Sequence, residues 1–156
     1  MANEPYLTAL ASFVLPGNTT SFTVSSIAAG YKDIVIYAQL RGGTSSQPNL
    51  RINGDSGGNY DFINNDQTNW GAGYLGMNAY IDTSTAAQAM YKITAFSYAK
   101  TDTFKHFLIE SSSQTNPAPG GGAWRSTNAI TSIQFNANTG TPMNSISRVD
   151  VYGVKA

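Results

Sequence analysis

The sequence predicts an all-β protein, a jelly-roll-like sandwich of two sheets, and three observations carry this prediction. Stretches of alternating apolar and polar residues recur along the chain, and Gly, Pro, Asn and Asp turn signals interrupt them at short intervals. Charged residues make up only 12% of the 156 residues, and Ser, Thr, Asn, Gln and Gly replace them, which suits strands joined by tight turns. We expect roughly eight to ten short strands. They form one domain spanning residues 1–156, with residues 1–9 as an N-terminal arm.

The first half of the chain contains three short strands and one long strand. Strands 10–15 and 20–24 are separated by Pro16-Gly17-Asn18, which places Pro and Gly where a type II turn needs them. In strand 31–40 the even positions from Ile34 to Leu40 are apolar and form one face. Strand 49–53 then leads into Asn53-Gly54, a strong hairpin signal.

Further strands are expected at 58–63 and 74–81, with loops at 64–73 and 111–122 and, at most, a helical turn at 84–90. In strand 90–98 both faces are apolar, because Met90, Phe96 and Tyr98 oppose the face of Tyr91 and Ile93. Such a strand needs cover on its second face, by a loop or by another subunit.

The last three strands are expected at 106–110, 132–137 and 146–154. All three alternate between apolar and polar positions, and the first two have a mostly polar outer face.

Composition excludes several functional classes. The chain has no cysteine, which rules out disulfides, thiolate metal ligands and cysteine nucleophiles. Nine basic residues balance nine acidic ones, which argues against a nucleic-acid partner. No segment resembles a signal peptide or a membrane span. We expect no cofactor.

Two segments imitate catalytic or cofactor motifs. Residues 54–58 read GDSGG, as around the nucleophile of chymotrypsin-like proteases, but the single histidine, His106, follows Ser56 in the chain and the protein is too short for that fold. Residues 71–76 satisfy GxGxxG, yet no helix is expected after them to hold a pyrophosphate. We interpret the first as a turn and the second as a junction between loop and strand, and expect no enzyme activity.

Metal sites are not expected either. His106 has no second His or Cys to complete a zinc site. The oxygen-bearing residues Asp61, Asn64, Asn65 and Asp66 lack the spacing of a calcium loop.

Aromatic and apolar side chains supply the candidate interface, because Trp and Tyr are enriched where proteins contact partners. The candidates are Trp70, Tyr74, Met90, Phe96, Tyr98 and Trp124. Core packing, and stacking on sugars by the tryptophans with Tyr60, Tyr74 and Tyr80, remain open as alternatives for the aromatic residues.

Four segments together resemble a family of small β proteins encoded among the structural genes of tailed bacteriophages. They read SIAAGYKDI at 26–34, LRINGDSGGNY at 50–60, WRSTNAITSI at 124–133 and SRVDVYGV at 147–154. This chain departs from the family pattern at Ala29, where proline is common.

The resemblance implies a virion protein made in the host cytoplasm. It implies a head decoration (cement) protein, a homotrimer bound to the major capsid protein, that stabilises the outer shell. A receptor- or carbohydrate-binding module of a tail fibre or tail tip is the alternative. A polar aromatic pocket formed by 64–73 and 111–123 would distinguish that alternative.

Overall fold

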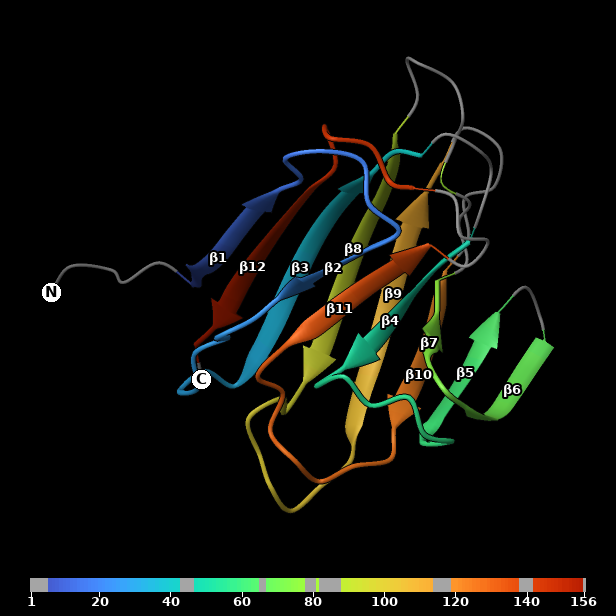
Figure 1. The fold of residues 1–156 in the computed structure, drawn as a ribbon. Helices are drawn as coiled ribbons and strands as arrows, with labels where there is room; N and C mark the ends of the chain where they lie inside the picture. Colours follow the sequence, from blue (N-terminus) through green and yellow to red (C-terminus); the bar gives the residue numbers. More distant parts are fainter. Residues whose placement is uncertain are drawn as a thin grey trace, which may run out of the picture.

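The structure is a computed structural model, and it describes residues 6–42, 47–64, 67–77, 81, 88–113, 119–137 and 142–155. Within these ranges it contains twelve strands in two antiparallel sheets and no helix (Figure 1). The two sheets pack against each other, which confirms the predicted all-β, two-sheet sandwich.

The larger sheet has eight strands in the order β1-β12-β3-β8-β9-β10-β5-β6. Their bounds are β1 Leu7–Val14, β3 Asp33–Leu40, β5 Tyr60–Asn64, β6 Gln67–Ala72, β8 Ala89–Phe96, β9 Lys105–Ser112, β10 Gly120–Trp124 and β12 Arg148–Val154. The last strand of the chain lies between the first strand and β3, so the two ends of the described chain are side by side (Figure 1).

The smaller sheet has four strands in the order β2-β11-β4-β7. Their bounds are β2 Ser21–Val24, β4 Pro48–Ile52, β7 Leu75–Gly76 and β11 Ile133–Ala137. This sheet lies over the middle of the larger one (Figure 1). The end strand β1 has no fully buried residue, and the smaller sheet covers it only in part, through the contact of Phe22 with Phe13.

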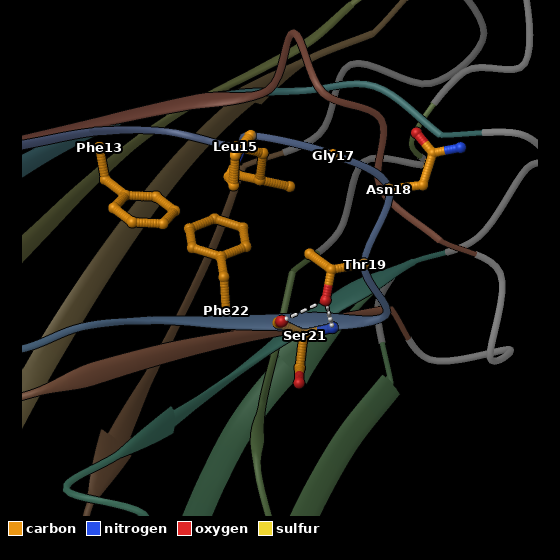
Figure 2. A pocket seen from close by; sticks show the side chains of 8 residues that line it. Phe13, Leu15, Gly17, Asn18, Thr19, Ser21 and Phe22 are labelled. Carbon is orange, nitrogen blue, oxygen red and sulfur yellow. Dashed lines mark hydrogen bonds between the residues drawn. The ribbon is translucent and has the colours of Figure 1, made fainter.

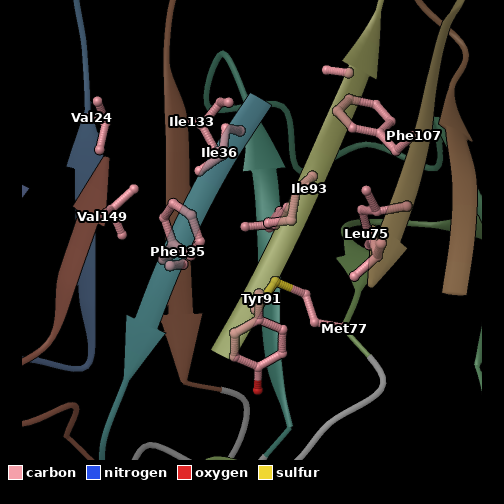
Figure 3. Close-up of a cluster of buried hydrophobic side chains, with 14 of the residues drawn as sticks. Val24, Ile36, Leu75, Met77, Tyr91, Ile93, Phe107, Ile133, Phe135 and Val149 are labelled. Carbon is pink, nitrogen blue, oxygen red and sulfur yellow. The ribbon is translucent and has the colours of Figure 1, made fainter. Parts of the chain in front are cut away.

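The core lies between the sheets and follows the alternation of the strands. Ile36, Ile93 and Phe107 of the larger sheet face Ile133 and Phe135 of the smaller one (Figure 3). Removing this apolar surface from water is the main force that holds the sheets together. The predicted inward face of strand 31–40 is confirmed, since Ile34, Ile36, Ala38 and Leu40 are completely buried.

Several local predictions are wrong. The segments 64–73 and 111–122 were expected to be loops, but β6 and β10 occupy most of the first and the end of the second. The expected N-terminal arm overlaps β1, because Leu7 to Ala9 pair with β12. Of the helical turn expected at 84–90, Ala89 and Met90 belong to β8, and residues 84–87 lie outside the described ranges.

The Asn53-Gly54 turn forms, but it does not make a hairpin. Both residues have positive φ, 51° and 71°, and Asp55 N donates to Ile52 O at 2.9 Å. Asn and Gly tolerate this left-handed conformation best. The strands on either side belong to different sheets, so the turn carries the chain from β4 in the smaller sheet to β5 in the larger one.

Candidate functional site

A groove crosses the outer face of the larger sheet where β9, β10, β5 and β6 lie side by side. It has a volume of about 440 Å³. We call it the outer groove, and its lining is Asp61, Phe62, Ile63, Thr68, Trp70, His106, Gly121, Gly122 and Ala123. Gly121 faces outward between Leu108 and Ile63 and has no side chain, so the backbone of β10 forms the floor of the outer groove there.

Exposed apolar side chains surround the outer groove. Phe96, Leu108, Ile63 and Trp70 are exposed by 41%, 46%, 55% and 76%. The register places Leu108 opposite Gly121, and Gly121 opposite Ile63, so these residues form one row across the sheet. We call these four residues the outer apolar patch. Apolar groups gathered on one face are typical of a surface that binds a partner.

The charges near the outer groove are paired. Asp61 Oδ2 lies 3.2 Å from Arg125 Nε, and Asp61 Oδ1 accepts a hydrogen bond from Gly71 N at 2.9 Å. On the same face Lys92 pairs with Glu110 at 2.6 Å. Binding at this face therefore has to rest mainly on apolar contact and shape rather than on net charge.

The structure separates the six candidate interface residues into three groups. Trp70, Met90 and Phe96 are exposed on the outer face of the larger sheet. Tyr74 is half-buried, with its ring centroid 5.9 Å from that of Phe62.

Tyr98 and Trp124 are buried, which corrects their assignment to an interface. Ser97 has a φ of 51°, and this turn ends the alternation of β8, so Tyr98 points inward and its hydroxyl donates to Ala28 O. Trp124 occupies an inward position of β10.

The GDSGG segment is held by hydrogen bonds to Asp55. Its carboxylate accepts from Trp124 Nε1 at 2.7 Å, from Asn59 Nδ2 at 2.9 Å and from Gly57 N at 2.8 Å. The bond from Trp124 is the main reason why the pKa of Asp55 lies below its ordinary value. Ser56 is exposed in the turn, and the bonds to Asp55 hold the conformation of the segment around it.

The GxGxxG segment joins two strands. Gly71 and Ala72 end β6, and Leu75 and Gly76 form β7, so strands stand on both sides of Gly73 and Tyr74. A Cβ on Gly73 would lie 2.8 Å from Ser56 O, which explains a glycine there without any ligand.

Lys105 is a buried charge that the sequence did not single out. Its Nζ donates to Thr103 O at 2.6 Å and to Thr127 O at 3.2 Å. Burial lowers the pKa of Lys105, and Asp102 opposes that effect. The lysine therefore joins the loops that precede β9 and follow β10, and both of its hydrogen bonds are structural.

A second hollow, of about 300 Å³, lies at the open side of the sandwich between β1 and β2. Figure 2 shows the rings of Phe13 and Phe22 facing each other there, with Leu15 beside them. The two rings stack at 5.5 Å, and Phe22 stacks on Phe135 at 5.1 Å. The stack therefore joins β1 of the larger sheet to β2 and β11 of the smaller one at this end of the core.

The described part of the chain contains no group of three or more His, Asp or Glu side chains arranged to hold a metal ion. Of the calcium candidates, Asp61 is paired with Arg125, while Asn65, Asp66 and the side chain of Asn64 lie outside the described part. No helix in the described ranges has the length and apolar character that crossing a bilayer requires.

Sequence reasoning named the segments 64–73 and 111–123, which supply Thr68, Trp70 and Gly121 to Ala123, but it missed the part of the outer groove that β5 and β9 form. Leu108 was the available signal, since it is a large apolar residue on the polar face of an alternating strand. The glycines of β10 gave no such signal, because a strand without side chains shows no alternation.

Comparisons with known proteins give no family for this chain. It matches no protein-family model, and a search of curated proteins finds no significant relative. Nothing in either comparison links it to phage structural proteins.

Proposed function

We propose that this chain is a non-enzymatic structural protein of a tailed-phage virion, a decoration protein that binds the outer surface of the capsid shell through the outer apolar patch. The observation that carries the proposal is the gathering of Phe96, Leu108, Ile63 and Trp70 on one face of the larger sheet. The location on a virion and the homotrimeric state in this proposal come from the family resemblance.

The paired charges support attachment by apolar contact. Lys92–Glu110 and Arg148–Asp150 satisfy each other within the subunit, and Asp61 is paired with Arg125. Binding through the outer apolar patch should therefore persist in about 0.5 M salt, where the Debye length falls to roughly 4–5 Å. Many weak contacts repeated over a shell would raise its resistance to rupture through avidity.

The test uses heads that lack this protein, to which purified protein is added before sedimentation. We expect the protein to sediment with the heads and to raise the temperature at which DNA escapes. Trp70→Ala and Leu108→Ala should each weaken attachment by about tenfold or more, as central interface residues do. Thr23→Ala, on the outer face of the smaller sheet, is the matched control and should bind like wild type. Loss of attachment at 0.5 M salt, or equal attachment by all variants, contradicts the proposal.

A receptor-binding module of the tail is the second candidate. Its support is the position of the outer groove, which is lined by Thr68 and Trp70 from 64–73 and by Gly121 to Ala123 from 111–123. Purified protein that fails to sediment with heads but blocks adsorption of phage to cells would favour this candidate over the shell.

A further inference from the structure

On the outer face of the smaller sheet the outward positions of β2, β11 and β4 are all polar, unlike those of the larger sheet. Phe22, Leu50 and Phe135 point into the core, so their strand neighbours point outward. These outward residues are Ser21 and Thr23 of β2, Gln134 and Asn136 of β11, and Asn49 and Arg51 of β4. The set contains amides, hydroxyls and one guanidinium, but no carboxylate.

A groove of about 360 Å³ lies on this face. We call it the polar groove, and its lining is Thr20, Ser21, Asn49, Arg51, Tyr74, Asn136 and Ala137. Because the two sheets pack face to face, the polar groove and the outer apolar patch lie on opposite sides of the subunit. A ligand in the polar groove and a shell bound to the patch do not compete.

Asn49 lines the polar groove and is only 6% exposed. Its Oδ1 accepts a hydrogen bond from Asn136 Nδ2 at 3.2 Å. Among the described residues, the Nδ2 end of the Asn49 amide has no partner. Exchanging the oxygen and nitrogen of this amide would only leave the other end unpaired. A buried amide group that lacks a hydrogen-bond partner is energetically unfavourable, and a donor or acceptor of a bound ligand would satisfy it.

Arg51 adds a positive charge beside Asn49. Its Nε donates to Gly73 O at 3.3 Å, which fixes the side chain along the groove. Within the described part of the chain no carboxylate pairs with Arg51, so its terminal NH₂ groups are available. An arginine guanidinium recognises a carboxylate by two parallel hydrogen bonds, which makes an anionic group the best match.

Tyr74 supplies an aromatic wall. The ring is half-buried and packs against Phe62, so it is held in place before any ligand arrives. An aromatic face beside amides and hydroxyls suits a ring that carries C–H groups on one side and hydroxyl groups at its edge.

We propose that the polar groove binds an acidic sugar residue, a pyranose that carries a carboxylate. The carboxylate pairs with Arg51, a ring hydroxyl accepts from Asn49 Nδ2, and the ring lies against Tyr74. This site goes beyond the proposed function and does not depend on it.

The test is an NMR titration of the ¹⁵N-labelled protein with four probes: methyl glucuronide, N-acetylneuraminic acid, methyl glucoside and inorganic phosphate. We expect at least one of the two acidic sugars to shift the resonances of Asn49, Arg51 and Ser21 until they saturate. Methyl glucoside and phosphate should bind at least about fivefold more weakly.

Two variants check the assignment. Arg51→Gln should lower the affinity for the acidic sugar at least about fivefold. Gln134→Ala lies on the same face outside the groove lining and should bind like wild type. Melting temperatures near wild type show that both variants fold, and both should still sediment with heads if the proposed function holds. Three results overturn the proposal: no shifts in the groove with either acidic sugar, equal binding of phosphate or methyl glucoside, or equal affinity of Arg51→Gln and wild type.

Discussion

Replacing Asp55 by alanine tests how the turn between the two sheets is held. The change removes the acceptor of three hydrogen bonds, of which those from Gly57 and Asn59 lie at the surface, where water can replace the carboxylate. The bond from Trp124 differs, because the indole ring is buried and its N–H loses its partner. A hydrogen bond to a charged group contributes about 1.5–3 kcal/mol.

This loss should be visible in thermal unfolding followed by circular dichroism at pH 7. For a domain of this size 1 kcal/mol shifts the melting temperature by roughly 2–4 °C, so we expect Asp55→Ala to melt about 3–12 °C below wild type. Ser56→Ala is the matched control, because Ser56 is exposed in the same turn, and it should melt within about 2 °C of wild type.

The difference should depend on pH in a defined direction. Folding lowers the pKa of Asp55 from its ordinary value of 3.8, chiefly through Trp124, so the folded protein binds this proton less readily than the unfolded chain. The stability that the carboxylate provides is therefore complete above about pH 5 and is lost as the pH falls below 3.8. The difference in melting temperature between wild type and Asp55→Ala should therefore be smaller at about pH 2 than at pH 7.

A double-mutant cycle with Trp124→Phe isolates the contact. If Asp55 acts through the indole N–H, Asp55→Ala should cost less in the Trp124→Phe background than in wild type. An equal cost in both backgrounds, or a gap that is the same at pH 7 and pH 2, would refute the reasoning.

Two further predictions concern the core and the outer groove. Burial raises the pKa of Tyr60 to about 12, so the folded protein holds that proton while the unfolded chain releases it near pH 10. Between about pH 10 and pH 12, Tyr60 should therefore lower the free energy of unfolding by about 1.4 kcal/mol per pH unit. Denaturation experiments on Tyr60→Phe should show a correspondingly smaller decrease of this free energy with pH. In β10, a Cβ on Gly122 would lie 2.6 Å from Leu75 Cδ1 and would also strike Asp61 O, so Gly122→Ala should lower the urea midpoint by about 0.5–1.5 M. Gly17→Ala, where nothing lies within 4 Å, should leave the midpoint close to wild type, and equal midpoints for the two variants would contradict the packing argument.

Strands with regular alternation could be predicted from the sequence because each side chain reports its own face. Strand β3 shows this, since all four predicted inward residues from Ile34 to Leu40 are buried, and of the outward positions only Val35 is buried as well. Strands β6 and β10 could not be predicted in this way. The first is mostly polar and lies at the end of the sheet, and the second begins with three glycines, which carry no side chain to alternate.

The candidate site was harder to predict than the fold for a related reason. Trp70 comes from the hairpin of β5 and β6, Leu108 and Gly121 come from the later pair β9 and β10, and only the pairing of β10 with β5 brings these two parts of the chain together. Strand order decides which outward residues meet, and alternation within one strand carries no information about it. Tyr98 and Trp124 were difficult for another reason. Large aromatic residues suit a core and an interface equally well, so the sequence does not show whether such a side chain points inward or outward.

The position of β12 between β1 and β3 has a consequence for folding on the ribosome. Strand β1 pairs with no other described strand, so Leu7–Val14 cannot join the sheet until Arg148–Val154 has been made. At synthesis rates of about 5–20 residues per second this delay is roughly 7–27 s. During that time the apolar residues of β1, including Phe13 and Val14, have no strand beside them, and an unpaired apolar strand readily joins another chain. Nascent chains crowded on one messenger RNA are therefore prone to aggregate through β1 until β12 has emerged.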